Sequence, residues 1–164
     1  IRARDVKPEL EVYNSAMLEE VDYLLGLGIF EPPHTINLVL HTPTQGGQRG
    51  TPRNLVDMVD RLRDLPVSQE NLRVNVTSMG PTQLPITTIG LAMGLNVRVG
   101  MEDNVFYRRG ELLQNNAQLV ERTVRIAREL AREPATPDEA RQMLGLRGRE
   151  VGQRPAGAEP AMSK

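Results

Sequence analysis

Four short runs of strand-forming residues, each followed by a stretch with helical periodicity, constrain the fold of this chain most strongly. The runs extend from Lys7 to Tyr13, Ile36 to Leu40, Leu72 to Thr77 and Asn96 to Met101. Apolar side chains recur every three or four residues in the stretches between and after them. This order predicts a parallel sheet with right-handed crossovers. Four such units form either half of an eightfold barrel or a small doubly wound sheet.

The helix boundaries are marked by capping residues. The first predicted helix begins after Asn14-Ser15 and ends near Gly26, and the second begins after Thr51 and ends near Leu62. Three further helices are predicted, from Leu84 to Met93, from Asn115 to Leu130 and from Thr136 to Leu144. The last of them opens with a Thr-Pro-Asp-Glu capping box. From residue 147 onward, Gly, Pro, Ala and charged residues occur without periodicity, which predicts a disordered tail after a domain of residues 1–146.

Composition excludes several classes of function. The 164 residues have a net charge of -1 and no basic face, so we expect binding neither to nucleic acid nor to membranes. No apolar run approaches the roughly 20 residues of a spanning helix. With no cysteine there is no disulfide, no thiolate nucleophile and no Cys-type zinc site, as in a cytoplasmic protein. Because the chain begins at Ile1 without an initiating Met, we expect it to be part of something longer.

The fourth strand run ends in a group of charged residues. Val97-Arg98-Val99 alternates as a strand does, and Glu102, Asp103 and Asn104 follow closely. The carboxyl ends of parallel strands are where ligands bind. An ion pair between Arg98 and Asp103 would orient the carboxylate and keep it ionised as a base. The alternative is an ion pair that only locks the strand in place.

Further polar residues are expected at the same ends of the other strands. Glu9 and Glu11 share one strand face, which must line a polar cavity or meet solvent. His41 is either a polar ligand or base, or a histidine in structural hydrogen bonds. Gly46-Gly47 precedes a helix and either contacts a phosphate or forms a simple turn. Ser78 and Gln83 complete the polar set at these strand ends.

Several segments, in one order, resemble the β-keto acid cleavage enzyme family. They are KPELEVY, the Gly-Gly loop after INLVL, SMGPTQ, VRVGMEDN, NAQLVER and TPDEARQMLGL, between Lys7 and Leu146. The resemblance implies the C-terminal half of a zinc-dependent (β/α)8 TIM barrel, with about four βα units plus a C-terminal helix. It also implies a reaction of a β-keto acid with acetyl-CoA that gives acetoacetate and a new CoA thioester.

The resemblance implies roles for individual residues. Asp103 is the general base, Arg98 orients and pairs it, and Glu102 is a zinc ligand. Glu11 or Glu9 lies near the variable end of the substrate. Asn104 and His41 are further substrate-binding candidates, and Gly46 and Gly47 are candidates for contact with the CoA thioester.

The zinc ligand set is incomplete in this chain. A catalytic zinc site usually has three protein ligands, and the His-x-His that the family uses has no counterpart here. We therefore expect the chain alone to be inactive, and the intact protein to be a homo-oligomer. The alternative function is that of a non-catalytic half-barrel, a binding or structural module that pairs with another chain.

Overall fold

The structure, a computed structural model, describes residues 6–146 and consists of alternating strands and helices. Its main elements are β1 (Glu9–Val12), α1 (Ser15–Gly26), β2 (His34–Leu40), α2 (Pro52–Arg61), β3 (Leu72–Ser78), α3 (Gln83–Ala92), β4 (Asn96–Val97), β5 (Phe106–Arg108), β6 (Glu111–Leu112), α4 (Asn116–Glu129) and α5 (Pro137–Leu144). Short 3-10 turns lie at Pro43–Gln45, Leu62–Asp64, Gln69–Asn71 and Gly80–Thr82. The tail that the sequence predicts from residue 147 lies outside the described residues.

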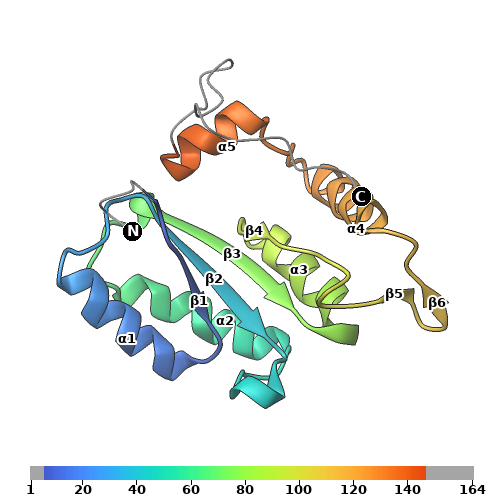
Figure 1. Cartoon of the computed structure of the whole chain (residues 1–164), viewed down its shortest axis with the longest axis horizontal. Coiled ribbons are helices and arrows are strands. Elements are labelled where there is room, and N and C mark those ends of the chain that lie inside the picture. Colours follow the sequence, from blue (N-terminus) through green and yellow to red (C-terminus); the bar gives the residue numbers. More distant parts are fainter. Residues whose placement is uncertain (1–5, 147–164) are drawn as a thin grey trace, which may run out of the picture.

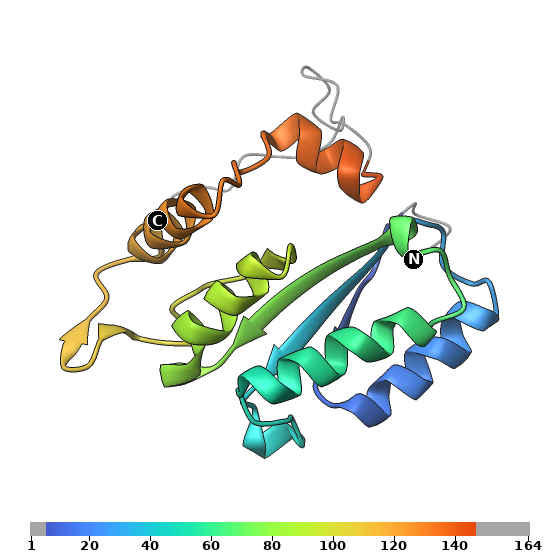
Figure 2. The ribbon, with the colours of Figure 1, turned by 180° about the vertical axis from the view of Figure 1, so that it is seen from behind.

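Four strands form one parallel sheet in the order β1-β2-β3-β4. Helices α1 and α2 lie side by side, and the sheet separates them from α4 and α5 (Figures 1 and 2). Each strand is followed by a helix on the way to the next, which is the repeat of a (β/α)8 barrel. The predicted α/β fold, a partial TIM barrel with an additional C-terminal helix, is confirmed.

One face of the sheet forms the hydrophobic core. Strand residues that point toward the helices are fully buried, and they pack against buried residues of α1, α2 and α3: Val12, Ile36, Leu38, Leu40 and Val76 from the strands, and Leu18, Leu55, Met58 and Ile86 from the helices. The alternation in β1 therefore has a simple cause. Leu10 and Val12 face the core, and Glu9 and Glu11 face the other side.

The opposite face of the sheet is polar. The strand register places Glu11 beside Asn37, Asn37 beside Asn75, and Asn75 beside Asn96. A row of four polar residues thus crosses the whole sheet at one level. In a closed barrel this face lines the interior, and the ends of the strands beyond this row form the face where such barrels bind their ligands.

The predicted helix starts are confirmed by their caps. The side chain of Asn14 accepts a hydrogen bond from Met17 N, and that of Thr51 accepts one from Asn54 N. Thr136 and Glu139 form the reciprocal capping box that the sequence predicts. Local polar side chains therefore fix where the helices begin, as the sequence indicates.

The predicted length of the fourth strand is wrong. Strand β4 contains only two residues, and not the six from Asn96 to Met101. Arg98 N still donates to Val76 O at 3.0 Å, but Asp103 N and Asn104 N both donate back to Gly100 O at 3.2 Å. A turn therefore replaces the ladder, because these amides bond within the segment and not to β3. The turn positions Asp103 beside the strand ends.

The β5–β6 hairpin was absent from the sequence-based prediction. Phe106 pairs with Leu112 and Arg108 with Glu111 in an antiparallel ribbon. Gly110 in its tip has a φ of 81°, a conformation that glycine adopts readily. The strands contain three and two residues, too short to show a period-two pattern.

Close packing of α3 on β3 gives a first prediction. A Cβ added at Gly90 would lie 2.3 Å from Val76 Cγ1, so Gly90→Ala forces the helix away from the strand. We expect the free energy of unfolding to fall by about 1–3 kcal/mol, measured by urea denaturation. Gly26→Ala is the matched control, because no atom lies within 4 Å of its added Cβ. An equal loss of stability in both variants would contradict the packing described here.

Candidate functional site

Asp103 lies in the turn after β4, at the C-terminal ends of the strands. Its side chain is 2% exposed. Thr77 Oγ1, at the end of β3, donates to Asp103 Oδ2 at 3.4 Å, and Gly80 N donates to the Asp103 carbonyl at 2.7 Å. Gln83 Nε2 donates to Gly100 O at 3.2 Å and anchors the start of the same turn. The carboxylate is thus fixed by neighbouring loops and is withdrawn from water.

Arg98 connects three carboxylates. Its Nη1 lies 3.0 Å from Glu11 Oε1, its Nη2 lies 3.6 Å from Asp103 Oδ1, and Nη2 also pairs with Glu102 Oε1. The Arg98–Asp103 ion pair expected from the sequence is present. Glu11 and Arg98 are 87 residues apart and come from opposite edges of the sheet. Curvature of the sheet brings these two side chains together across its polar face.

The structure separates the two glutamates of β1. Glu11 also accepts hydrogen bonds from Tyr13 OH at 2.7 Å and from Asn37 Nδ2 at 3.4 Å. Glu9 instead accepts from Asn75 Nδ2 at 2.6 Å and does not pair with Arg98. Of the two substrate-binding candidates, Glu11 joins the charged cluster, and Glu9 lies one level nearer the N-terminal ends of the strands.

Burial sets the electrostatics of the cluster. Removal from water raises the pKa of Asp103, and the charge of Arg98 opposes this rise without cancelling it. The sequence predicted only the effect of the arginine. Burial lowers the pKa of Arg98, but the hydrogen bond that Arg98 donates to Glu102 and the three carboxylate charges outweigh it and raise the pKa overall. The hydrogen bond to Glu11 raises the pKa of Tyr13. Asp103 is therefore a stronger base than an exposed aspartate.

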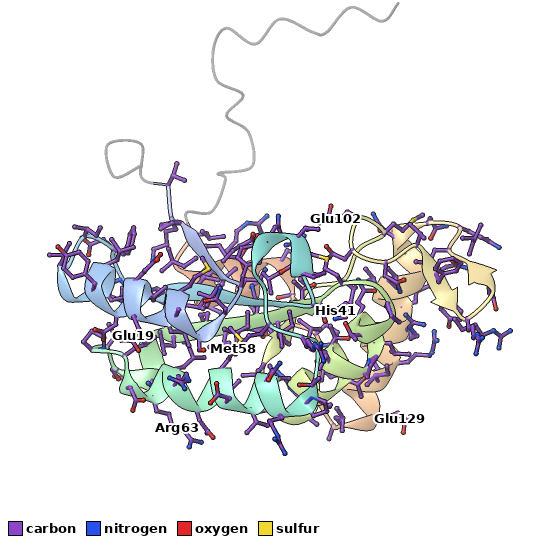
Figure 3. All side chains as sticks on the ribbon, turned by 90° about the horizontal axis from the view of Figure 1, so that it is seen from below. Glu19, His41, Met58, Arg63, Glu102 and Glu129 are labelled. Carbon is purple, nitrogen blue, oxygen red and sulfur yellow. The ribbon has the colours of Figure 1, made fainter. Side chains whose placement is uncertain are left out.

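Among residues 6–146, the other predicted site residues make no hydrogen bond or ion pair with this cluster. His41 has a φ of 64°, and its backbone N–H donates to the backbone carbonyl of Gln48 at 2.7 Å. Figure 3 shows His41 and Glu102 in the half of the molecule that contains the C-terminal ends of the strands. The Asn104 side chain bonds to both backbone groups of Phe106, so it holds the start of the hairpin.

The Gly46-Gly47 loop is closed by its own hydrogen bonds. Gly47 N donates to Thr42 O at 2.9 Å, and the left-handed φ of 71° at Gly46 completes this turn. A Cβ at Gly47 would lie 1.9 Å from Thr42 Oγ1, so close approach of the loop to itself requires glycine there. Contact of this loop with a CoA thioester stays a prediction.

A zinc ion would find only part of its ligand set here. Within residues 6–146, no group of three His, Cys, Asp or Glu side chains could hold a metal. Glu102, the predicted ligand, is exposed and pairs with Arg98. It can offer one carboxylate, and the remaining ligands of a catalytic zinc would have to come from elsewhere.

Within residues 6–146, no helix is both long and apolar enough to cross a membrane.

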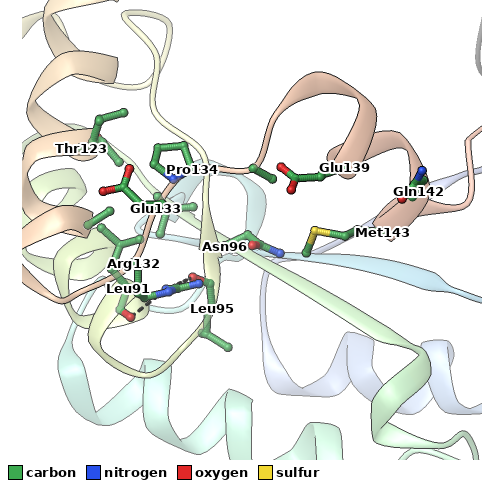
Figure 4. A pocket seen from close by; sticks show the side chains of 14 residues that line it. Leu91, Leu95, Asn96, Thr123, Arg132, Glu133, Pro134, Glu139, Gln142 and Met143 are labelled. Carbon is green, nitrogen blue, oxygen red and sulfur yellow. Dashed lines mark hydrogen bonds between the residues drawn. The ribbon is translucent and has the colours of Figure 1, made fainter.

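Two of the larger cavities lie near opposite ends of the segment from Asn96 to Asp103. One, of about 620 Å³, lies between β4 and the α4–α5 region and is lined in part by Leu91, Asn96 and Met143 (Figure 4). Arg132 in its wall donates to Leu91 O and Leu95 O, both at 2.8 Å. This cavity lies at the start of β4, away from Asp103. The other, of about 750 Å³, adjoins Glu102 and Asp103.

The fold and the charged cluster define a class of protein: a partial TIM barrel with an acid–base group at the strand ends where such barrels have their active sites. A family model described as beta-keto acid cleavage enzyme matches residues 1–146. The chain belongs to this family.

Individual relatives agree with the family model. The 3-keto-5-aminohexanoate cleavage enzymes of Acetoanaerobium sticklandii and Fusobacterium nucleatum are 36% and 38% identical over 141 and 144 residues, which are 86% and 88% of this chain and 49% of each relative. A 3,5-dioxohexanoate:acetyl-CoA acetone transferase of Paraburkholderia graminis is 30% identical over 146 residues, 89% of this chain and 46% of the relative. The chain thus spans about half the length of these curated relatives.

A solved structure supports the fold. The apo structure of ObcA superposes with a TM-score of 0.64 at 20% sequence identity, over 86% of this chain and 37% of that one. At this identity the likeness establishes the fold alone. The coverage agrees with a partial barrel.

The structure adds residues whose contacts with the cluster the sequence did not predict. Tyr13 and Asn37 hold Glu11, and Thr77 holds Asp103. The alternation of the strand places Tyr13 on the same face as Glu11, but this spacing does not predict a hydrogen bond between them. Thr77 ends the third strand run beside Ser78. Its contact depends on the turn that replaces the end of the fourth strand.

Removal of the shared cation should destabilise the cluster. Arg98→Gln leaves Glu11, Glu102 and Asp103 facing one another without the positive charge. We expect the free energy of unfolding to fall by about 1–3 kcal/mol at neutral pH, as measured by urea denaturation. The exposed pair of Arg61 and Asp57 gives the control, because Arg61→Gln should cost less than about 0.5 kcal/mol. Equal losses would show that the Arg98 cluster adds nothing beyond a surface pair.

The raised pKa of Asp103 gives a stability that depends on pH. The folded chain holds the Asp103 proton more tightly than the unfolded chain, in which the pKa of this carboxyl group is 3.8. The free energy of unfolding therefore falls as the pH rises from 3.8 to the raised pKa of the folded state. Asp103→Asn removes this titration. We therefore expect its free energy of unfolding, relative to wild type, to increase over this window and then to level off. Urea denaturation from about pH 4 to about pH 8 measures it. Asp57→Asn, on an exposed helix face, should show no such trend.

Proposed function

We propose that this chain supplies the proton-transfer half of the active site of a β-keto acid cleavage enzyme. In this proposal the intact protein reacts a β-keto acid with acetyl-CoA and forms acetoacetate and a new CoA thioester. The observation that supports it best is a buried Asp103 with a raised pKa, fixed beside Arg98 at the C-terminal ends of the strands. The family membership and the acetyl-CoA in the name of the Paraburkholderia relative point to the same reaction.

The chemistry requires a base before it requires anything else. A carbon between a ketone and a carboxylate has an acidic C–H, and Asp103 would remove this proton. The resulting enolate would form a C–C bond to the thioester carbonyl of acetyl-CoA, with CoA as the leaving group. The released thiolate would then attack the original ketone. Cleavage of the old C–C bond releases the new thioester and the enolate of acetoacetate. This enolate takes back the proton that Asp103 removed, so acetoacetate forms, the base is regenerated and all atoms are conserved.

The neighbouring residues have supporting roles in this proposal. Arg98 would hold Asp103 in position and offer positive charge to the developing enolate. Glu11, which Tyr13 and Asn37 fix on the polar face, would contact the variable part of the substrate. Glu102 would leave Arg98 and provide one of the zinc ligands. A bound zinc would polarise the carbonyl oxygens of the substrate.

A full-length barrel with this chain as its C-terminal half tests the base assignment. Asp103→Asn should lower kcat about 10²- to 10⁴-fold, the usual contribution of a general base, and leave the zinc content unchanged. Formation of acetoacetate from acetyl-CoA and a β-keto acid measures the rate. Elemental analysis measures zinc.

Two comparisons separate the roles. Glu102→Gln should lower the zinc content, and Asp57→Asn should change neither zinc nor rate. The chain alone should hold no stoichiometric zinc and show no cleavage. A near-normal rate for Asp103→Asn would refute the base assignment. Cleavage by the chain alone would refute the half-site proposal, and an inactive full-length barrel would favour a non-catalytic half-barrel that binds another chain.

A further inference from the structure

A groove next to Asp103 has features that the acid–base cluster does not use. It has a volume of about 750 Å³ and lies between the start of α3 and the β5–β6 hairpin. Residues from Glu102 to Gly110 form one wall, and Pro81, Leu84 and Pro85 contribute to the other. Figure 1 shows the hairpin projecting past α3, away from the sheet. The groove therefore leads outward from the charged cluster.

The middle of the groove is apolar and open. Leu84, Val105 and Phe106 line it, and they are 38%, 48% and 46% exposed. Large apolar side chains from two separate elements thus face one groove. Such a surface fits a ligand that has an uncharged, flexible arm.

The outer part of the groove is positively charged. Arg108 and Arg109 lie in the hairpin tip and both line the groove. Arg108 pairs with Glu111 but stays 78% exposed. Arg109 has no ion-pair partner among residues 6–146, so its guanidinium is available to an anion.

The base of the hairpin is held in place by two arginines of α4. The Arg122 guanidinium lies 4.5 Å from the centre of the Tyr107 ring, and its Nη1 donates to Tyr107 O. Arg125 Nη2 donates to Tyr107 OH at 3.2 Å. These contacts fix the residue next to Arg108, so the groove wall is formed before a ligand arrives.

We propose that this groove binds the pantetheine arm of a CoA thioester and directs its phosphates to Arg109 and Arg108. The charge distribution sets the direction of the ligand. Glu102 and Asp103 repel phosphates at the inner end, and the two arginines attract them at the outer end. The neutral thioester then lies toward Asp103. The choice of CoA rests on the proposed function and on the acetyl-CoA in a relative's name.

Every residue of the groove wall belongs to this chain, so equilibrium binding tests the proposal without turnover. The probes are CoA and pantetheine, titrated by calorimetry into the purified 164-residue chain. Wild type should bind CoA saturably, and added salt should weaken the binding. Arg109→Gln should raise the Kd for CoA about three- to tenfold and leave the Kd for pantetheine unchanged. Leu84→Glu should raise both.

Arg63→Gln is the control, because Arg63 is also an exposed surface arginine, in this case one that pairs with Asp60. It should leave both Kd values unchanged, and circular dichroism should show that every variant is folded. The proposal is overturned if folded wild type does not bind CoA, or if Arg109→Gln binds it as wild type does. A second copy of the chain in the groove would instead appear as a dimer that Leu84→Glu dissociates, without CoA binding.

The result is separable from the proposed function. CoA binding that depends on Arg109, with no cleavage in a full-length barrel, would retain the groove and reject the reaction. Cleavage that is accompanied by CoA binding independent of Arg109 would retain the reaction and reject the groove.

Discussion

The pairing of Arg98 with Glu11 is the interaction on which the rest of the site depends. These side chains start from opposite edges of a four-stranded sheet, and their nitrogen and oxygen are 3.0 Å apart. A flat sheet would hold β1 and β4 three strand spacings apart, roughly 14 Å. In a flat sheet both side chains would have to lie fully extended along its surface, whereas curvature brings them together on the concave face. The ion pair and the barrel curvature therefore depend on each other.

One face of the sheet forms the stabilising core, and the other face has the polar residues of the candidate site. The face toward α1, α2 and α3 is apolar and mostly buried, and it forms the hydrophobic core. The other face has Glu11, Asn37, Asn75 and Asn96 in one row, an arrangement that a stable core alone does not require. Asn37 is completely buried, yet its Oδ1 has no hydrogen-bond partner in the described part of the chain.

The sequence predicted the elements well where local signals decide them. Alternating residues placed Leu10 and Val12 on the core face, and Asn14, Thr51 and Thr136 marked the helix starts. It failed where the choice of hydrogen-bond partners and the strand register decide. The fourth strand ends early because the amides of Asp103 and Asn104 bond to Gly100, which no periodicity reveals. The contents of the charged cluster were predictable from Arg98 to Asp103, but the choice of Glu11 over Glu9 required the register.

Arg132 has a consequence for the order in which the chain acquires its structure. It donates to the carbonyls of Leu91, Gly94 and Leu95, which follow or end α3, and it lies 41 residues after Leu91. A helix end leaves carbonyl groups without partners, and here a later segment satisfies them. The end of α3 is therefore completed only after α4 has docked. A chain cut before Arg132 would therefore keep the local hydrogen bonds at the end of α3 and lose those that Arg132 adds.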